Sequence, residues 1–236
     1  MTLQEIYDIA INMAVKADPR GEKAVRALLE KKKKEYKELP EKQKKLFDLE
    51  SLHNPYADSR ILYGEPKTKI KTIIAGIDGG TGEVLVADRL REKGRNIDLV
   101  VVHHPSGHAY AALHEVMDIQ ADMFAEAGVP INIGSALMAD RAAFIQRRID
   151  PANHNQTVDA ARLLDIPFMC MHTFWDNLTN KFFIDKFKHK TFDTVGEILD
   201  FISDIPEFVE STKGKAGPSI ASGSKNSKAG RIYITM

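Results

Sequence analysis

The sequence has almost no cysteine and no excess of charge of either sign. Cys170 is the single cysteine, which excludes an internal disulfide framework and a zinc cluster built from cysteines. The 33 Lys and Arg residues balance 33 Asp and Glu residues, so the chain has no global attraction for nucleic acid or for an anionic membrane. The lysine run at 31–34 is followed by glutamates and indicates a solvated helix face. We therefore expect no nucleic-acid partner.

Long apolar segments are missing as well. No stretch approaches the roughly 20 apolar residues that cross a bilayer. The N-terminus carries acidic residues among its apolar ones and shows no signal-peptide pattern, so we expect a cytoplasmic protein without a membrane partner. The 236 residues, 43% of them apolar, are nevertheless enough to build a substantial core and exclude wholesale disorder.

Composition divides the chain into three regions. Residues 1–64 are polar and show helical spacing of their apolar residues, which predicts a helical N-terminal region. Residues 65–211 alternate short apolar runs with helical stretches, as in an α/β domain. Residues 212–236 contain a Gly/Ser/Lys-rich linker over 213–230, which we expect to be mobile, and then a strand-like segment over 231–236.

The central region predicts an α/β fold with a mixed or parallel sheet flanked by helices. Apolar runs rich in β-branched residues predict strands of one sheet over 70–77, 98–102 and 168–172. The first two strands and the helix between them form a βαβ unit, which should cross over right-handed. The segment 129–133 is compatible with a brief strand or an extended link. Helical spacing predicts further helices over 109–128, 135–149, 151–164, 178–187 and 194–209.

Two adjacent histidines, His103 and His104, follow the predicted strand 98–102 and precede Pro105. Open α/β sheets place their ligands at the carboxyl ends of strands. Imidazole suits zinc, iron, manganese and nickel, and adjacent histidines can serve one ion or two neighbouring ions. The alternative is that both histidines merely end a strand.

A second polar motif follows the last predicted strand and contains His172 and Asp176. It should emerge at the same sheet edge as His103 and His104, and the carboxylate of Asp176 supplies the hard oxygen ligand that many metal sites contain. His172 is open to three interpretations: a further ligand, an outer hydrogen-bonding group, or a buried histidine without a ligand.

The remaining motifs are weaker. The loop 78–82, Asp-Gly-Gly-Thr-Gly, joins a strand to a helix N-terminus as phosphate-binding loops do, but it matches neither common phosphate-loop pattern. Backbone geometry alone explains its glycines. Cys170 lies within a strand, where burial should make its thiol inert.

Together these motifs resemble the Nif-three-like family, the NGG-one-interacting-factor-three proteins that are also described as GTP cyclohydrolase I type 2-like. The resemblance rests on Asp78 with the helix start after it, on His-His-Pro at 103–105, and on His-Thr-x-x-Asp at 172–176. It implies a two-lobed α/β fold, assembly into a homo-oligomeric (hexameric) ring, and a dinuclear metal site with ligands at His103, His104 and Asp176.

The resemblance also implies an activity. The leading hypothesis is a metal-dependent hydrolase with one or two divalent ions, acting on a nucleotide such as GTP or on another phosphorylated small molecule. The alternatives are a metal-binding protein without turnover and a protein-interaction or regulatory module. The family pattern includes a further histidine and glutamate on a C-terminal segment. We therefore expect a truncated form, with self-association and weakened metal binding.

Overall fold

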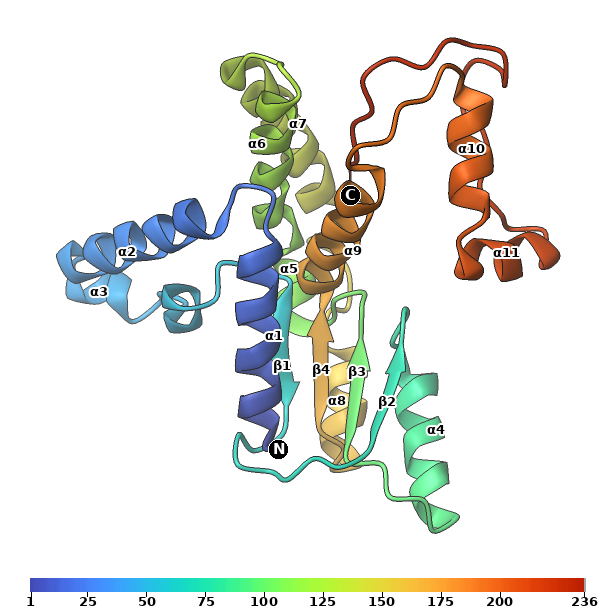
Figure 1. Ribbon diagram of the computed structural model, residues 1–236. Helices are drawn as coiled ribbons and strands as arrows, with labels where there is room; N and C mark the ends of the chain where they lie inside the picture. The colour runs from blue at the N-terminus through green and yellow to red at the C-terminus, as the bar shows by residue number, and fades with distance from the viewer. Residues whose placement is uncertain (236) are drawn as a thin grey trace. The chain divides into compact units, whose positions relative to one another are not determined.

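Four short strands form one mixed sheet in the order β1-β4-β3-β2 in the computed structural model, which describes residues 1–235 (Figure 1). The strands are β1 (Ser59–Tyr63), β2 (Ile73–Gly76), β3 (Leu99–Val102) and β4 (Phe168–Met171). Strands β2, β3 and β4 are parallel, and β1 pairs antiparallel with β4. Every residue of β3 and β4 is buried, as continuous apolar strands inside a parallel sheet require. The predicted α/β fold with a mixed sheet flanked by helices is confirmed.

Helices cover both faces of the sheet. On one face, α4 (Thr81–Glu92) and α8 (Gln156–Leu163) contribute Val84, Ala87 and Ala161 to a buried cluster that includes residues of β3 and β4. Figure 1 shows α1 (Leu3–Ala17) on the opposite face. The order β2, α4, β3 is the predicted βαβ unit, and it brings the carboxyl ends of β2, β3 and β4 to one edge.

The other helices up to and including α9 extend from this α/β centre. Thr2 caps α1 through a reciprocal pair of contacts with Glu5, which satisfies two backbone N–H groups of the first turn. Helices α6 and α7 contact each other along their length. These elements are α2 (Glu22–Glu38), α3 (Glu41–Lys44), η1 (Leu49–Leu52), α5 (Gly107–Ala111), η2 (Leu113–Met117), α6 (Asp118–Glu126), α7 (Ile131–Ile149) and α9 (His172–Phe187).

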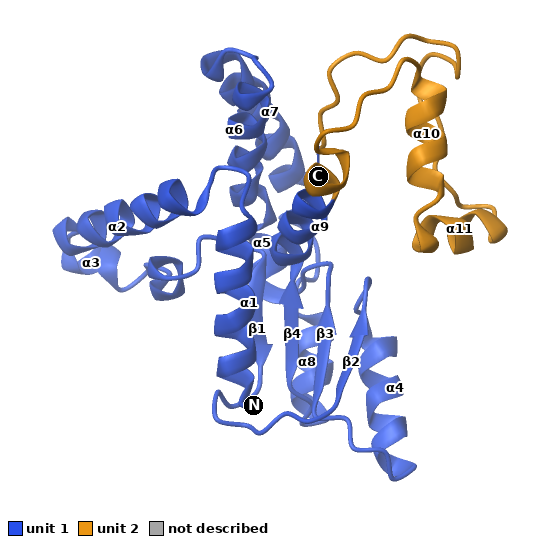
Figure 2. Cartoon of the chain, viewed as in Figure 1, with its two compact units in different colours: residues 1–182, 235–236 blue, residues 183–234 orange. Residues whose placement is uncertain are grey.

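The chain divides into two units, drawn in two colours in Figure 2. Unit 1 contains Met1–Phe182 together with Thr235, and unit 2 contains Phe183–Ile234. Unit 2 carries α10 (Val195–Ser203) and α11 (Pro206–Lys213). Aromatic rings of Phe187, Phe192 and Phe201 lie with centroids 5.2–5.8 Å apart and supply its apolar contacts.

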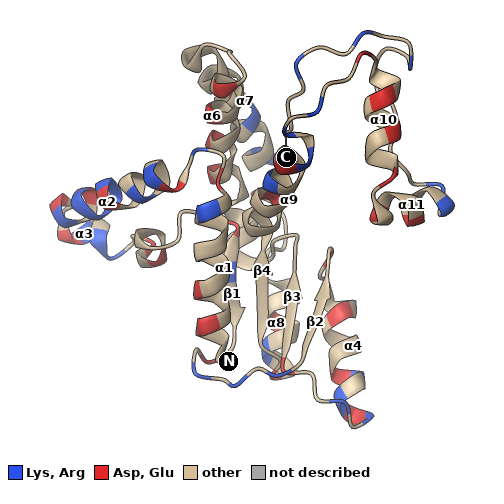
Figure 3. Cartoon of the chain, in the orientation of Figure 1, with Lys and Arg blue, Asp and Glu red and all other residues tan. Residues whose placement is uncertain are grey.

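Charged residues of both signs lie along α2, as Figure 3 shows. Lys33 pairs with Glu30 at 2.7 Å and Lys31 lies 3.7 Å from Glu35. This pattern is that of a solvated helix face, as the sequence predicts for the lysine run. Within the described residues, no helix combines the length and the apolar character that crossing a bilayer requires.

Several local predictions need correction. The region 1–64 is not wholly helical, because Ser59–Tyr63 forms β1 and pairs with β4. The segment 129–133 forms no strand, since α7 begins at Ile131 directly after Pro130. Helix α8 begins at Gln156 rather than 151, because the carbonyl of His154 accepts a hydrogen bond from the N–H of Gly107 (2.7 Å).

The end of the chain also differs from its prediction. Residues 231–235 form no strand in the structure; position 236 lies outside the described residues. Part of the predicted linker is hydrogen-bonded: Gly196 N–H donates to the carbonyl of Lys225, and Ala229 N–H donates to that of Asp193, both at 2.9 Å. Mobility of the linker, and the domain divisions at 64/65 and 211/212, stay predictions.

Candidate metal centre

His103 and His104 stand at the carboxyl end of β3, fixed by the neighbouring strand. The backbone N–H of His103 donates to the carbonyl of Gly76 (3.0 Å), and that of His104 donates to the carbonyl of Ile77 (2.9 Å). Because both donors are bound to the end of β2, the two histidines cannot shift along the sheet edge without breaking main-chain hydrogen bonds.

His172 joins them from the adjacent strand. It follows β4 directly and is the first residue of α9. Its ring stacks on that of His103 with centroids 4.5 Å apart, and the rings of His103 and His104 lie 4.9 Å apart. One possible ligand nitrogen from each of the three imidazoles lies within 4.8 Å of the others. We call these three residues the histidine group.

Asp176 adds a carboxylate from the next turn of α9. Its Oδ2 lies 3.1 Å from His172 Nδ1, and its Oδ1 lies 3.6 Å from His103 Nε2. The i,i+4 spacing of His172 and Asp176 places both on one helix face. The structure thus brings together the three residues that the sequence predicts as ligands, His103, His104 and Asp176, and adds His172 to them.

Two further carboxylates contact the outer sides of these imidazoles. Asp58 is fully buried; its Oδ2 accepts from Thr173 Oγ1 (2.7 Å) and lies 3.1 Å from His172 Nδ1. Asp78 Oδ1 lies 2.6 Å from His104 Nδ1. No sequence motif marks Asp58, and the sequence marks Asp78 only as part of the loop 78–82 and of the family resemblance.

The electrostatic setting keeps one imidazole neutral. Burial, followed by the charges of His172 and His104, lowers the pKa of His103 to about 4. Burial also opposes charge on His172, but contact with Asp58 and the charge of Asp176 outweigh it and raise the pKa of His172. The pKa of Asp176 is raised, chiefly by burial. Neutral imidazole is the form that binds metal, so His103 is ready to act as a ligand at physiological pH.

Two buried imidazole nitrogens fit a metal better than they fit the protein alone. His103 Nδ1 and His172 Nδ1 are buried without a hydrogen bond; the latter lies 3.1 Å from carboxylate oxygens of Asp58 and Asp176. Leaving a buried polar atom unsatisfied costs about 1–3 kcal/mol. Three imidazoles and a carboxylate are a donor set suited to zinc and its first-row neighbours. The residues present therefore fit a divalent metal ion.

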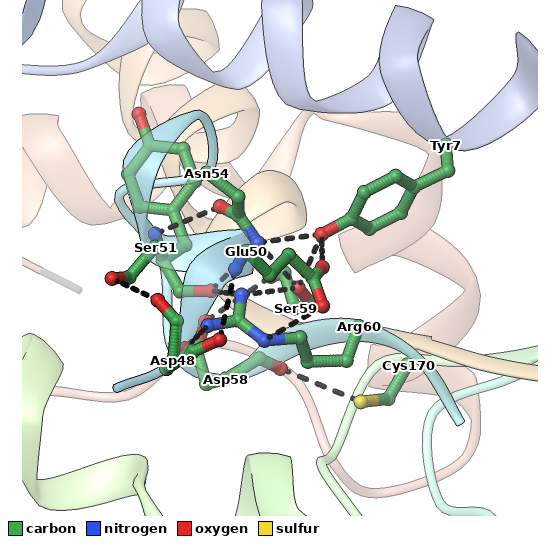
Figure 4. A network of polar contacts seen from close by, with 10 residues as sticks. Tyr7, Asp48, Glu50, Ser51, Asn54, Asp58, Ser59, Arg60 and Cys170 are labelled. Carbon is green, nitrogen blue, oxygen red and sulfur yellow. Dashed lines mark hydrogen bonds and ion pairs between the residues drawn. The ribbon is translucent and has the colours of Figure 1, made fainter. Parts of the chain in front are cut away.

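A buried arginine anchors the segment that carries Asp58 (Figure 4). Arg60, 1% exposed, donates to the carbonyls of Tyr56 (2.6 Å) and Ser59 (3.0 Å) and pairs with Asp48 at 2.9 Å. We call Arg60 with these partners, and with Tyr7, Glu50 and Asn54 which join them by side-chain contacts, the Arg60 network. It ties η1 and α1 to the start of β1, next to Asp58.

Helix α9 is anchored in the same way from its buried side. Asn177, fully buried, donates to the carbonyl of Ala14 (3.1 Å) and to Tyr56 Oη (3.3 Å). Tyr56 in turn donates to the carboxylate of Asp18 at 2.9 Å. These bonds fix the rotation of α9 about its axis, and hence the direction of Asp176, the residue before Asn177.

The other histidines lie outside the histidine group within the described part of the chain. His154 Nε2 contacts the carbonyl of Ile149 (2.9 Å) and His114 Nδ1 that of Ala111 (3.2 Å), so both bond to local backbone. His108 lies on α5, while His53 and His189 are exposed. As predicted, Cys170 is buried, and burial raises the pKa of its thiol to about 12.

Comparison with known proteins agrees with this geometry. No protein-family model and no curated protein matches the chain. A crystal structure of a NIF3 superfamily protein from Sphaerobacter thermophilus superposes with a TM-score of 0.62 at 25% sequence identity, over 75% of this chain and 63% of that one. This likeness supports the assignment of the chain to the NIF3-like family. It spans 63% of the length of this structural relative.

The likeness to a NIF3 superfamily structure and the histidine group together fit a NIF3-like chain with a site that could hold a metal ion. The predicted family resemblance is confirmed. The identity and number of the metals, the ligand role of each residue, and any reaction belong to the proposal that follows.

Proposed function

We propose that this NIF3-like chain is a metal-dependent hydrolase that holds one or two divalent ions with His103, His104 and Asp176, assisted by His172. The observation that carries the proposal is the histidine group: three ligand nitrogens within 4.8 Å of one another, at the sheet edge where α/β proteins bind ligands. Asp176 contributes the carboxylate that offsets the charge of a bound ion.

The residues around the ion have distinct tasks. When bound, a divalent ion supplies Lewis-acid polarisation of the substrate and lowers the pKa of water at the site. His103 supplies a neutral nitrogen because burial keeps it unprotonated. Asp58 supports the His172 side of the site through its contact at 3.1 Å, and Thr173 holds Asp58 in place.

The proposed substrate is a nucleotide such as GTP, or another phosphorylated small molecule. Support comes from the family resemblance and from the chemistry of the donor set, since divalent ions polarise phosphoryl and carbonyl oxygens. By the same resemblance we propose a homo-oligomer, with a hexamer as the specific form; a cytoplasmic location is proposed as well.

One observation favours a second candidate, a metal-binding protein without turnover. Two of the carboxylates near the histidine group are already engaged, Asp58 by Thr173 and Asp78 by His104, and are poorly placed to serve as a general base. A regulatory role through a protein partner is compatible with such a site.

Metal analysis tests the metal site. Protein purified without chelator should contain a stoichiometric divalent metal, and the His103→Ala, His104→Ala double variant should lose most of it. His53→Ala is the matched control, because His53 is exposed and outside the group. Equal metal content in the three proteins would contradict the proposal.

Turnover separates the two candidates. The metal-loaded protein is incubated with GTP and other nucleotides, with and without chelator, and products are identified by chromatography. Chelator-sensitive hydrolysis that the double variant lacks supports the hydrolase. Stoichiometric metal without any turnover favours the non-catalytic metal protein.

A further inference from the structure

The loop after β2 is held firmly against the end of β3. The carbonyls of Gly76 and Ile77 accept the backbone N–H groups of His103 and His104. Gly79 packs so closely on Val102 that a Cβ at position 79 would overlap the valine side chain. Only glycine therefore allows this approach, and Asp78 is presented from a backbone fixed on both sides.

The Asp78 side chain meets His104 at hydrogen-bonding distance. Its Oδ1 lies 2.6 Å from His104 Nδ1. A carboxylate oxygen accepts and does not donate, so His104 Nδ1 carries the proton in this contact. The other ring nitrogen, Nε2, is then left with its lone pair. A ligand nitrogen needs that lone pair, and the hydrogen bond on the opposite nitrogen decides which one has it.

The same loop is poorly suited to the phosphate role that its glycines suggest. Phosphate loops offer free backbone N–H groups at a helix N-terminus. Here the N–H of Gly80 donates to the Glu83 carboxylate at 2.7 Å, so the first turn of α4 is already capped by an anion of its own chain. The observations therefore favour an intramolecular task for this loop.

We propose that the loop 76–80 positions a metal ligand: it holds Asp78 against His104 Nδ1 and thereby sets the tautomer in which Nε2 is free to bind metal. The inference rests on the proposed function, because a free Nε2 serves metal binding only if the site binds a metal ion. Asp78 is a positioning residue, because it acts through His104. Gly79 serves the close approach of the loop to Val102 of β3 rather than a bound phosphate.

The tautomer can be measured without any metal. Long-range ¹⁵N–¹H correlation spectra of the apo protein at pH 8 distinguish Nδ1–H from Nε2–H histidine. Wild type and Asp78→Asn should show His104 as the Nδ1–H tautomer, because the amide oxygen of asparagine still accepts the proton. Asp78→Ala should shift His104 toward Nε2–H. The same tautomer in all three proteins would overturn the inference.

Metal affinity supplies the second readout, with Co²⁺ alone as the probe. Asp78→Ala should bind Co²⁺ about 10-fold more weakly than wild type, the lower end of the range for outer-shell partners of ligands. Asp78→Asn should recover most of the affinity. The melting temperature of the apo protein should not change, because the Asp78 side chain is 85% exposed. Asp140→Ala, an exposed carboxylate on α7, is the matched control.

Three results decide against the inference: unchanged Co²⁺ affinity in Asp78→Ala, an equal loss in Asp140→Ala, or saturable shifts of the Gly79 and Gly80 amide resonances on addition of inorganic phosphate. Failure of wild type to bind Co²⁺ would contradict the proposed function instead. The tautomer spectra would still decide whether Asp78 positions His104.

Discussion

Unit 1 contains two polar clusters that differ in how their charges are satisfied. In the Arg60 network one buried cation contacts Asp48 and two backbone carbonyls, with Glu50 3.5 Å away. In the histidine group three potential cations face one another, and two of their nitrogens are buried without a hydrogen bond. The first arrangement offsets its charge with carboxylates of the protein itself, although Arg60 Nε lies 3.5 Å from Glu50 without a hydrogen bond, and it acts as a structural anchor. The second gains partners when a metal ion binds.

The largest expected effect comes from breaking the Arg60 network. Arg60→Ala should lower the free energy of unfolding by about 2–5 kcal/mol, because it leaves the buried carbonyls of Tyr56 and Ser59 without their donor. Urea denaturation followed by circular dichroism measures the change. Arg26→Ala is the control: this arginine pairs with Glu22 at 2.8 Å but is 52% exposed, so its loss should cost less than about 1 kcal/mol. Equal losses in the two variants would contradict the comparison.

The histidine group should instead change the stability of the protein when metal binds. Zinc at about 100 times its Kd should stabilise wild type by about 2.7 kcal/mol. In the His103→Ala, His104→Ala variant this stabilisation should disappear while the apo protein stays folded. Thermal unfolding with and without zinc measures both quantities. An apo protein that unfolds on loss of the two histidines would show that they, like Arg60, are structural.

Acid should weaken the apo protein through His103. Its pKa is about 4 in the folded chain against an ordinary 6.5, so the unfolded state binds the proton more readily. The contribution of neutral His103 is therefore complete above about pH 6.5 and is lost as the pH falls toward about 4, on the order of 1–3 kcal/mol in full.

The contribution of His172 to stability depends on pH in the opposite direction. Its pKa is raised on folding, so its contribution is present below about pH 6.5 and is lost as the pH rises through the folded value. Urea midpoints from pH 8 to pH 4.5 should fall less steeply toward acid in His103→Gln than in wild type. Parallel curves would contradict the assignment to His103.

The smallest effect concerns Cys170, which neither cluster uses. Its thiol is buried and its pKa is raised to about 12, so a maleimide should not label the folded apo or metal-loaded protein. Labelling in urea is the positive control. Rapid labelling of the folded protein would show that β4 opens, and with it the base of the histidine group.

The sequence identified the parts of the fold with strong local patterns. Buried strands such as Leu99–Val102 consist entirely of apolar β-branched or branched residues, and their prediction was correct. Strand β1 was missed because Ser59 and Arg60 do not resemble a strand; β4 and the buried polar contacts determine its conformation. The segment 231–235 shows the converse, a strand-like pattern that does not form a strand in the structure.

The candidate site was predictable where local sequence patterns are strong, and not where contacts between distant parts of the chain create it. His103, His104 and Asp176 follow apolar strands, and parallel strands bring their carboxyl ends together. Asp58 lies 114 positions before His172 in the sequence but contacts it in the folded chain. No spacing rule could therefore connect the two. Asp78 was visible in the sequence, but its contact with His104 depends on the close packing of Gly79 against Val102.

The most direct test of the central claim is anomalous X-ray diffraction from crystals grown with zinc. The account predicts a zinc peak bounded by His103, His104 and His172, with the Asp176 carboxylate in or next to its coordination shell. Zinc at other residues only, or an occupied site that leaves these imidazoles uncoordinated, would contradict it.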